Sequence, residues 1–414
     1  MENQGKRNKV TNFLSTLQQE ISNSSAVIIF LAILSGFIFG GILVILTTPS
    51  VYQAFRISLF TGLKASWSIV FETYSALLLG AFGDPAKINA AFQSGDALLI
   101  REAINPFFDS LVVSTPYIFT GLAMVVAFRA GVFNIGAEGQ LYIGSIFAAW
   151  AGWTFKGLPP IIHVPLALSV GAFAGGIWGM IPGWLKAKTG AHEVINTIMM
   201  NYIAFNFVYY LIAGPFRDKT QIVPKTPLIE ESAHLFRFFA DPIRFNLGFF
   251  IAIGIAILIW FILFRTTWGY ELRTVGLNPH ASRYAGMNIT TVTVLAMSLS
   301  GALAGLAGAV EMLGVRWRQS QALSTGYGFD SIALALLAKN HPIGVIFTAL
   351  LFGFMRSGSR VMQLRAGIPI DIISILQSFI ILFIAAPAII RTMYRLKEPK
   401  QKILDLTSAP TGDK

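Results

Sequence analysis

Cysteine is absent from this chain of 414 residues, and charged residues make up only 12% of it. The absence of thiols excludes disulfides, thiolate metal sites, iron–sulfur clusters and cysteine nucleophiles. A phosphate-binding loop is also missing, because the one Gly-Lys pair, at residues 5 and 6, lacks the upstream glycine and the following Ser or Thr. We find no Ser/His/Asp order, no paired catalytic carboxylates and no metal-ligand cluster. The sequence therefore predicts neither an enzyme nor a chain that hydrolyses ATP itself.

Long uncharged runs dominate what is present. Apolar residues make up 54% of the chain, and Ala26–Leu46 contains 21 residues without a charge. A helix of that length crosses about 30 Å of hydrocarbon. Similar segments recur to the end of the chain, and we predict an all-α polytopic membrane protein with about ten membrane helices within residues 26–391. The expected spans are 26–46, 107–128, 134–154, 161–184, 191–213, 246–264, 289–313, a shorter piece at 327–338, 341–357 and 370–390.

Ten crossings place both termini on one side of the membrane. Once the long segments 47–106 and 214–245 are discounted, Lys and Arg concentrate on the side of the N-terminus, which predicts that this side is cytoplasmic. The net charge of +11 suits anionic lipid headgroups better than nucleic acid. We therefore expect 47–106 and 214–245 to be outer segments, with Ala65–Gly83 as an interfacial or re-entrant helix interrupted by Glu72.

Two terminal segments complete this domain organisation. Residues 1–25 form either a short interfacial helix or a simple lead-in to the first span, and residues 392–414 form a basic cytoplasmic tail.

Residues 128–140 are the least lipid-like segment between two apolar spans. The run includes Asn134, Gly136, Glu138, Gly139 and Gln140. Non-helical backbone at membrane depth survives only where protein or a wet cavity surrounds it, and a glutamate facing lipid costs several kcal/mol. The segment predicts a broken helix beside a translocation pathway. The alternative is a tight cytoplasmic turn with a solvated Glu138.

A second irregular element occurs at 324–330, where two glycines and Asp330 precede an apolar run. The two elements fall at the third crossing of the first five and the third crossing of the last five. Five crossings per half give the halves opposite orientations, so the pattern predicts two inverted repeats with broken helices near a central pathway.

Residues 192–201 open the fifth crossing and include Asn196 and Asn201. The segment contains no second histidine at zinc-motif spacing. Either asparagine can line a polar pathway or form hydrogen bonds between helices. Glycines at 171, 175 and 179 and at 301 and 305 predict places where helix backbones approach each other closely.

The inner loop at 265–288 contains a short predicted helix. Asn278 and Pro279 suit its start, and Gly286 suits its end. The loop is either a contact surface for another protein or an ordinary connector.

Five motifs, in order, resemble the permease subunits of bacterial sugar/nucleoside ABC importers, within the branched-chain amino acid/ribose-type permease superfamily. They are AFRAGVFNIGAEGQLYIG, HEVINTIMMNYIA, GLNPHASRYAGMN, SLSGALAGLAGAVE and GYGFDSIALALLA, and the resemblance spans about residues 26–392. The nucleoside (purine/guanosine-type) branch is the most similar, because ribose-type relatives have Asp-Leu-Ser-Val-Gly where this chain has Asn134 to Glu138.

The resemblance implies the partners: a second permease subunit, a cytoplasmic ATPase with two nucleotide-binding domains, and an external substrate-binding lipoprotein. ATP and Mg²⁺ would bind the ATPase and not this chain, which would lie in the bacterial cell membrane. The implied ATPase contact uses Gly276, Asn278, Pro279, Ala281, Ala285 and Gly286, and Ser282 stands where relatives tend to have alanine. The implied mechanism is alternating access around a pathway that involves Asn134, Glu138, Gln140, Asn196, Asn201 and Asp330.

Other functions remain open at this stage. A ribose or simple-sugar ABC permease is the nearest alternative. A proton- or sodium-coupled transporter also favours inverted repeats and midplane acids, but it needs no cytoplasmic docking helix.

Overall fold

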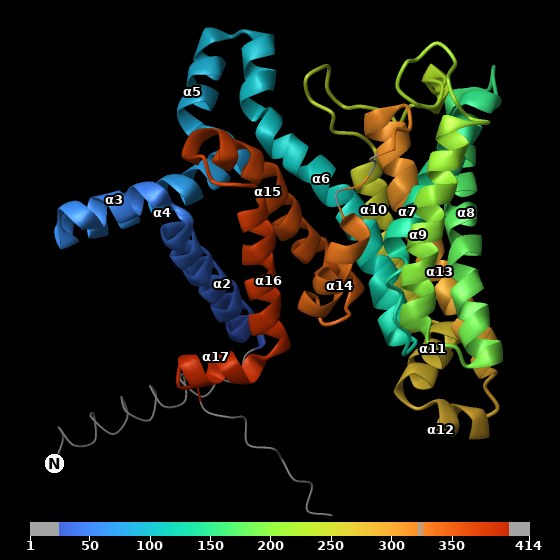
Figure 1. The fold of residues 1–414 in the computed structure, drawn as a ribbon. Coiled ribbons are helices and arrows are strands. Elements are labelled where there is room, and N and C mark those ends of the chain that lie inside the picture. Colours follow the sequence, from blue (N-terminus) through green and yellow to red (C-terminus); the bar gives the residue numbers. More distant parts are fainter. Residues whose placement is uncertain (1–24, 322–323, 325, 397–414) are drawn as a thin grey trace, which may run out of the picture. The chain divides into compact units, whose positions relative to one another are not determined.

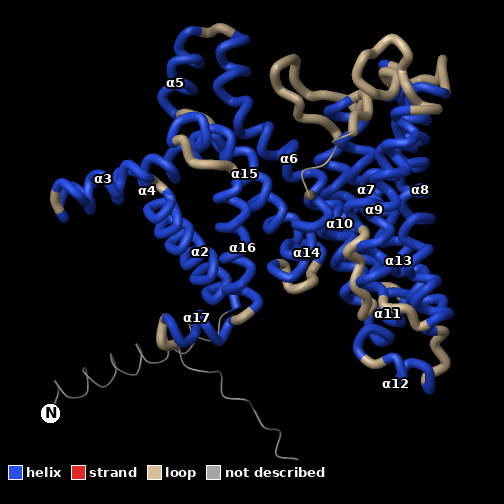
Figure 2. Tube along the Cα trace, viewed as in Figure 1, coloured by secondary structure: helices blue, strands red, loops and turns tan. Residues whose placement is uncertain are grey.

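The computed structural model describes residues 25–321, 324 and 326–396. Within these ranges the protein is helical, with no β-strand, and the single bridge pairs Arg237 with Asn246. Figure 2 shows the helices and the loops that join them. The chain divides into two units, Met1–Leu43 with Ser374–Lys414, and Val44–Ile373. The predicted N-terminal helix and most of the predicted basic tail lie outside the described residues.

The smaller unit contains most of α2 (Ser25–Thr47), most of α16 (Asp371–Ala385) and all of α17 (Pro387–Met393). Gly36 lets α2 approach α16, since a Cβ at this position would collide with the Ile380 side chain. Below this contact, Ile28, Ala32 and Phe383 form an apolar cluster with Ile390. Helices α16 and α17 meet at a bend of 87°.

The larger unit contains the remaining helices (Figure 1). They are α3 (Pro49–Ile57), α4 (Leu59–Phe82), α5 (Pro85–Ser94), α6 (Ala97–Arg129), α7 (Ala137–Thr154), α8 (Pro160–Thr189), α9 (Glu193–Ala213), η1 (Glu231–Ala233), α10 (Gly248–Arg265), α11 (Thr267–Leu277), α12 (Pro279–Tyr284), α13 (Ile289–Glu311), η2 (Met312–Arg316), α14 (Tyr327–Leu337) and α15 (Pro342–Ala366).

Packing within this unit follows a crossed pattern. Helix α8 packs along α13, and α15 packs along α6. Helix α7 also contacts α13, while α14 contacts α6. Helices α6 and α13 are the second crossings of the two predicted repeats. Each of them packs against the third and fourth crossings of the other repeat. This reciprocal pairing is the arrangement that two inverted repeats produce.

The predicted small-residue stripes lie where α8 and α13 touch. A Cβ at Gly175 would lie 2.5 Å from the Gly301 carbonyl oxygen, and one at Gly305 would lie 2.5 Å from the Gly171 carbonyl oxygen. Only glycine permits backbones this close, and close backbone packing is a main source of helix association in lipid. The predicted close approach is confirmed for both stripes.

Eight helices among the described residues are long and apolar enough to cross a membrane, or nine if the bent pair α16–α17 counts as one span. The all-helical polytopic fold is therefore confirmed, and ten is an approximate count. Two predicted spans are not in this set: α7, whose first turn carries Glu138 and Gln140, and the short apolar helix α14.

One candidate span was not expected. Residues 59–94 are long and apolar enough to cross, although the sequence predicted an outer segment with an interfacial or re-entrant helix there. Helix α4 continues past Glu72 without a break, and Glu72 is exposed. The outer location of 47–106 stays a prediction.

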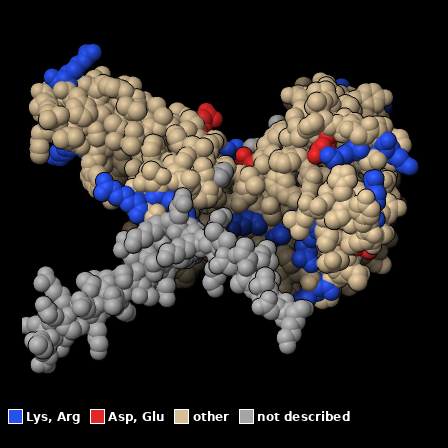
Figure 3. Space-filling model, turned by 90° about the horizontal axis from the view of Figure 1, so that it is seen from below, with Lys and Arg blue, Asp and Glu red and all other residues tan. Residues whose placement is uncertain are grey.

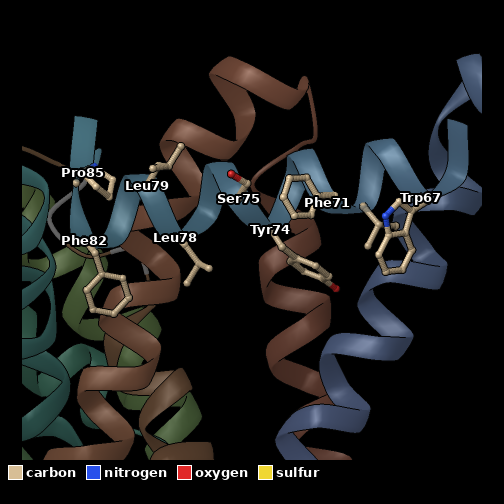
Figure 4. A pocket seen from close by; sticks show the side chains of 10 residues that line it. Trp67, Phe71, Tyr74, Ser75, Leu78, Leu79, Phe82 and Pro85 are labelled. Atoms are coloured by element: carbon tan, nitrogen blue, oxygen red, sulfur yellow. The ribbon is translucent and has the colours of Figure 1, made fainter. Parts of the chain in front are cut away.

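Helix α4 presents an apolar groove of about 510 Å³. Trp67, Phe71, Leu78 and Phe82 contribute its large side chains (Figure 4), and Trp67 is 75% exposed. The lining is almost entirely apolar, so the groove offers little chemistry for binding a polar solute. Exposed aromatic and aliphatic side chains of this kind suit contact with lipid.

Candidate functional site

The two irregular elements singled out in the sequence meet directly. The Glu138 carboxylate, in the first turn of α7, accepts a 2.6 Å hydrogen bond from the Gly328 backbone N–H in the first turn of α14. A Cβ at Gly328 would lie 2.6 Å from the Glu138 Cα, so the contact requires glycine. Glu138 is 3% exposed. This burial excludes a solvated glutamate at a turn and favours the broken-helix interpretation.

A carboxylate at this position suits the local electrostatics. The first N–H groups of a helix have no partner within the helix, and they carry its partial positive charge. Glu138 lies in the first turn of α7 and supplies a hydrogen-bond acceptor to the first turn of α14. The two helix starts are therefore joined by this hydrogen bond, and we call the contact the α7–α14 junction.

Buried amides hold the non-helical segment that leads into α7. Asn134 Nδ2 donates to Gln140 Oε1 at 2.8 Å, and Gln140 Nε2 donates to Asn134 Oδ1 at 3.0 Å. Asn134 Nδ2 also donates to the Ser300 hydroxyl of α13 at 2.8 Å, and that hydroxyl donates to the Ala123 carbonyl of α6 at 2.7 Å. The segment is thus tied to α6 and α13.

Of the two α9 asparagines that the sequence singled out, only Asn201 joins this network. Its Oδ1 accepts from the Gly139 N–H at 2.8 Å, and its Nδ2 donates to the Ile135 carbonyl at 2.9 Å. Asn196 lies elsewhere, and its buried Nδ2 has no hydrogen-bond partner among the described residues. For Asn201 the structure therefore shows hydrogen bonding between elements, one of the two roles that the sequence left open.

Asp330 lies two residues beyond the junction glycine on α14. Its Oδ2 accepts a 2.7 Å hydrogen bond from the Tyr117 hydroxyl of α6. The Tyr117 ring meets the Tyr327 ring edge to face, with centroids 4.8 Å apart. These two tyrosines connect α6 to the start of α14. Neither tyrosine was predicted as a site residue, since a tyrosine in an apolar run carries no distinguishing spacing.

The predicted short helix in the 265–288 loop is α12. Asn278 Oδ1 accepts from the Ala281 N–H at 3.0 Å, Pro279 occupies the first turn, and Gly286 follows the helix with φ +82°. The start and end signals are therefore confirmed. Most of the α12 surface is exposed, but Ser282 is only 3% exposed and points inward, donating to the Asn278 carbonyl at 3.0 Å.

Gly276 of α11 has a different environment from the rest of this loop. A Cβ there would collide with the Arg129 carbonyl oxygen and would lie 2.8 Å from the Gly131 nitrogen. Gly131, with φ +71°, begins the non-helical segment that leads to Asn134. Gly276 therefore joins α11 to the segment that builds the α7–α14 junction, a connection that the sequence did not predict.

Positive charge gathers at the α11–α12 end of the larger unit. Figure 3 shows Lys and Arg side chains spread over this face, with few acids among them. The basic residues there are Arg129, Lys186, Lys188, Arg265, Arg273, Arg283 and Lys339, and the acids are Glu193 and Glu271. Arg129 also donates to the Asn340 carbonyl at 2.9 Å, which links the end of α6 to the turn after α14.

The opposite end carries the 214–247 segment, which packs on η2. The Trp317 indole stacks on the His234 ring, with centroids 4.5 Å apart, and the Arg237 guanidinium carbon lies 4.1 Å from a Trp317 ring centroid. Burial, followed by the positive charge of Arg237, lowers the pKa of His234. In the same segment, Asp218 accepts hydrogen bonds from Thr220, which lower the pKa of its carboxyl.

These features define a polytopic helical membrane protein whose two halves meet at broken helices, as in transporters. Residues 107–385 match the family described as the branched-chain amino acid transport system / permease component, and the chain belongs to this family. No solved structure matches the chain.

Several curated relatives are similar over most of their length. The guanosine ABC transporter permease protein NupP of Bacillus subtilis (strain 168) is 47% identical, over 83% of this chain and 95% of its own. The nucleoside ABC transporter permease protein NupB of Lactococcus lactis subsp. cremoris (strain MG1363) is 38% identical, over 73% and 84%. The glucose ABC transporter permease protein TsgB13 of Haloferax volcanii is 32% identical, over 66% and 74%.

Proposed function

We propose that this chain is the permease subunit of an ATP-driven ABC importer that takes up nucleosides. The observation that carries the proposal is the 47% identity to a guanosine permease across 95% of that relative. The buried α7–α14 junction supports it, because irregular backbone surrounded by protein at membrane depth is typical of a transport pathway. Asn134, Glu138, Gln140, Asn201 and Asp330 would shape that pathway.

The proposed complex contains a second permease subunit, a cytoplasmic ATPase with two nucleotide-binding domains, and an external lipoprotein that captures the substrate. ATP and Mg²⁺ would bind the ATPase. The exposed surface of α12 and its neighbour supports an ATPase contact there, because Leu277 is 86% exposed and Tyr284 is 95% exposed. Large apolar side chains this exposed at an otherwise basic end suit a protein partner.

The proposed location is the bacterial plasma membrane, with both termini in the cytoplasm. The basic α11–α12 end supports this orientation, since short loops rich in Lys and Arg stay on the cytoplasmic side. The long 214–245 segment would then be external.

Backbone contacts suggest how a movement of α12 would reach the pathway. Gly276 lies at the end of α11, directly before α12, and it packs against the backbone at Gly131. From Gly131 the chain runs through Asn134 to Glu138 and its hydrogen bond to Gly328. A shift of α12 driven by the ATPase would therefore act on the α7–α14 junction through rigid backbone contacts rather than through a flexible loop.

A simple-sugar ABC permease is the second candidate, and the 32% identity to a glucose permease supports it. Both candidates would have the same membrane architecture. Family membership does not fix the substrate. The exposed α12 argues against a secondary transporter.

Uptake of labelled guanosine, adenosine, cytidine and ribose by cells with and without this gene tests the proposal. We expect nucleoside uptake to require the gene and ribose uptake to be independent of it. Loss of ribose uptake alone would support the sugar permease. Uptake that persists when ATP is depleted but collapses with the ion gradients would contradict an ABC importer.

A further inference from the structure

A polar cavity of about 350 Å³ lies within the larger unit, and its lining includes Tyr327, next to the junction glycine Gly328. It is bounded by α6, the end of α13 with η2, the start of α14, the second half of α15 and the segment before α10, so both predicted repeats contribute to it. The residues that give it chemical character are Arg244, Glu311, Arg316, Tyr327, Arg356 and Arg360.

Four arginines around one cavity suggest an anion site at first, but carboxylates nearly balance them. Arg316 Nε donates to Glu311 Oε1 at 3.0 Å. Asp109 of α6 forms ion pairs with both Arg244 and Arg360, the second at 3.3 Å.

The fourth arginine, Arg356, interacts electrostatically with Asp330. The surroundings therefore carry four positive and three negative charges. A site of this composition does not favour a phosphate or a carboxylate strongly over a neutral solute.

Paired guanidinium and carboxylate groups match the hydrogen bonding of a sugar diol. Each hydroxyl both donates and accepts, an ionised carboxylate only accepts, and a guanidinium only donates. Glu311 with Arg316 presents an acceptor beside a donor at the cavity wall. A cavity of roughly 300 Å³ or more is large enough for a small ligand.

One aromatic residue lines the cavity. Tyr327 lines it, and the Tyr117 ring lies edge to face against Tyr327. Tyr327 is directly followed by Gly328, whose N–H binds Glu138. A ligand against Tyr327 would therefore rest one residue away from the α7–α14 junction, with its base beside the tyrosine side chain.

We infer that this cavity is an outward-facing binding site for an uncharged nucleoside, with its ribose hydroxyls at the Glu311–Arg316 pair and its base toward Tyr327. The inference rests on the proposed nucleoside function and adds a place and a binding chemistry to it. A nucleoside released from the external lipoprotein would occupy this site before the junction opens.

The test compares initial uptake rates of labelled guanosine and 2′-deoxyguanosine in cells that carry Glu311→Gln. The variant weakens the acceptor for the ribose hydroxyls, and a hydrogen bond to a charged group is worth enough to change the ratio of the two rates about tenfold. The lipoprotein is unchanged, so any shift in the ratio belongs to this chain. Glu230→Gln is the matched control, because Glu230 pairs with Lys156 at 3.9 Å outside the cavity. We expect the control to keep the wild-type ratio.

Equal loss of both substrates in Glu311→Gln would show a structural ion pair and would overturn the inference while the proposed function stands. Absence of any nucleoside uptake by the unmodified chain would instead overturn the proposed function.

A second variant keeps the inference testable if Glu311→Gln fails to accumulate. Val315→Cys places a thiol in the cavity wall of a chain that has no other cysteine. A membrane-impermeant thiol reagent should label it in intact cells, and guanosine should slow the labelling in the assembled complex more than guanosine 5′-monophosphate does. No labelling from outside, or stronger protection by the nucleotide, would contradict an outward-facing site for a neutral nucleoside.

Discussion

The α7–α14 junction and helix α12 show two opposite ways of using polar and apolar groups. At the junction, charged and amide side chains are buried and bind other parts of this chain, as Glu138 binds the Gly328 N–H at 2.6 Å. At α12 and the adjoining end of α11, the apolar side chains of Tyr284 and Leu277 are almost fully exposed. The junction is complete within one chain, whereas the α12 surface is suited to a partner. Substitutions at the two places should therefore fail in different ways.

The largest effect is expected at α12. Ala285→Arg adds a long charged side chain to the exposed end of this helix, where φ is ordinary, so the fold should survive while the partner surface does not. We expect uptake to fall to background with normal abundance in the membrane. His192→Arg is the control, because His192 is exposed at the same basic end and makes no capping hydrogen bond with its side chain. Normal uptake and normal copurification of the ATPase with Ala285→Arg would contradict a docking role.

The next effect is expected at the junction. Glu138→Leu leaves the buried Gly328 N–H without an acceptor, which costs about 1–3 kcal/mol in the state that needs this contact. Uptake should fall about tenfold or more, and more than membrane abundance falls. Glu138→Gln keeps an acceptor, so its uptake should lie between that of the unmodified chain and that of Glu138→Leu. Uptake in Glu138→Leu that simply follows its abundance would assign the residue to folding alone.

A third, smaller effect is expected at Gly276. It tests whether this glycine only supports helix packing or also couples ATP hydrolysis to uptake. Gly276→Ala places a methyl group against the Arg129 carbonyl and the Gly131 backbone, where overpacking typically costs about 1–3 kcal/mol. If α11 transmits motion, ATP hydrolysis by the complex should persist while nucleoside uptake falls. Gly254→Ala on α10 is the control, because nothing lies within 4 Å of its added Cβ. Parallel loss of hydrolysis and uptake would mean that Gly276 only supports the fold.

The smallest effect concerns the pH dependence of stability at the 214–247 segment. Burial and Arg237 lower the pKa of His234 in the folded protein, so the unfolded chain binds a proton first as the pH falls. Stability should therefore be full above about pH 6.5, the ordinary value for histidine, and should decline below it. The thermal unfolding midpoint of the purified protein should drop between pH 7.5 and pH 5.5, and His234→Phe should reduce that drop. An unchanged pH dependence in the variant would show that His234 does not cause the drop in the unfolding midpoint.

Sequence patterns predicted those parts of the structure in which local chemistry decides the outcome. The glycine stripes at 171–179 and 301–305 lie in contact because lipid-embedded helices associate through close packing. The two irregular elements were predicted as matching broken helices, and the structure joins them through Glu138 and Gly328. Asn278 and Pro279 start α12, as their capping preferences indicate.

Contacts between distant parts of the chain were not predictable in the same way. Tyr117 binds Asp330 across 213 residues, and the pairing follows from the crossed packing of α6 with α14 rather than from any local spacing. The sequence underestimates helix α4, because Glu72 within an apolar run predicts an interruption that the structure does not contain. One charge does not end a helix of 24 residues.

The central claim is that the α12 end faces the cytoplasm and the 214–245 segment faces outward, and paired cysteine labelling tests it most directly. Lys219→Cys and Ala281→Cys are both exposed and each is the single thiol of its chain, whereas Ser282 is too buried to serve. An impermeant thiol reagent should label Lys219→Cys in intact cells and Ala281→Cys only after permeabilisation. The opposite pattern, with Ala281→Cys labelled in intact cells, would place α12 outside and contradict its contact with a cytoplasmic ATPase.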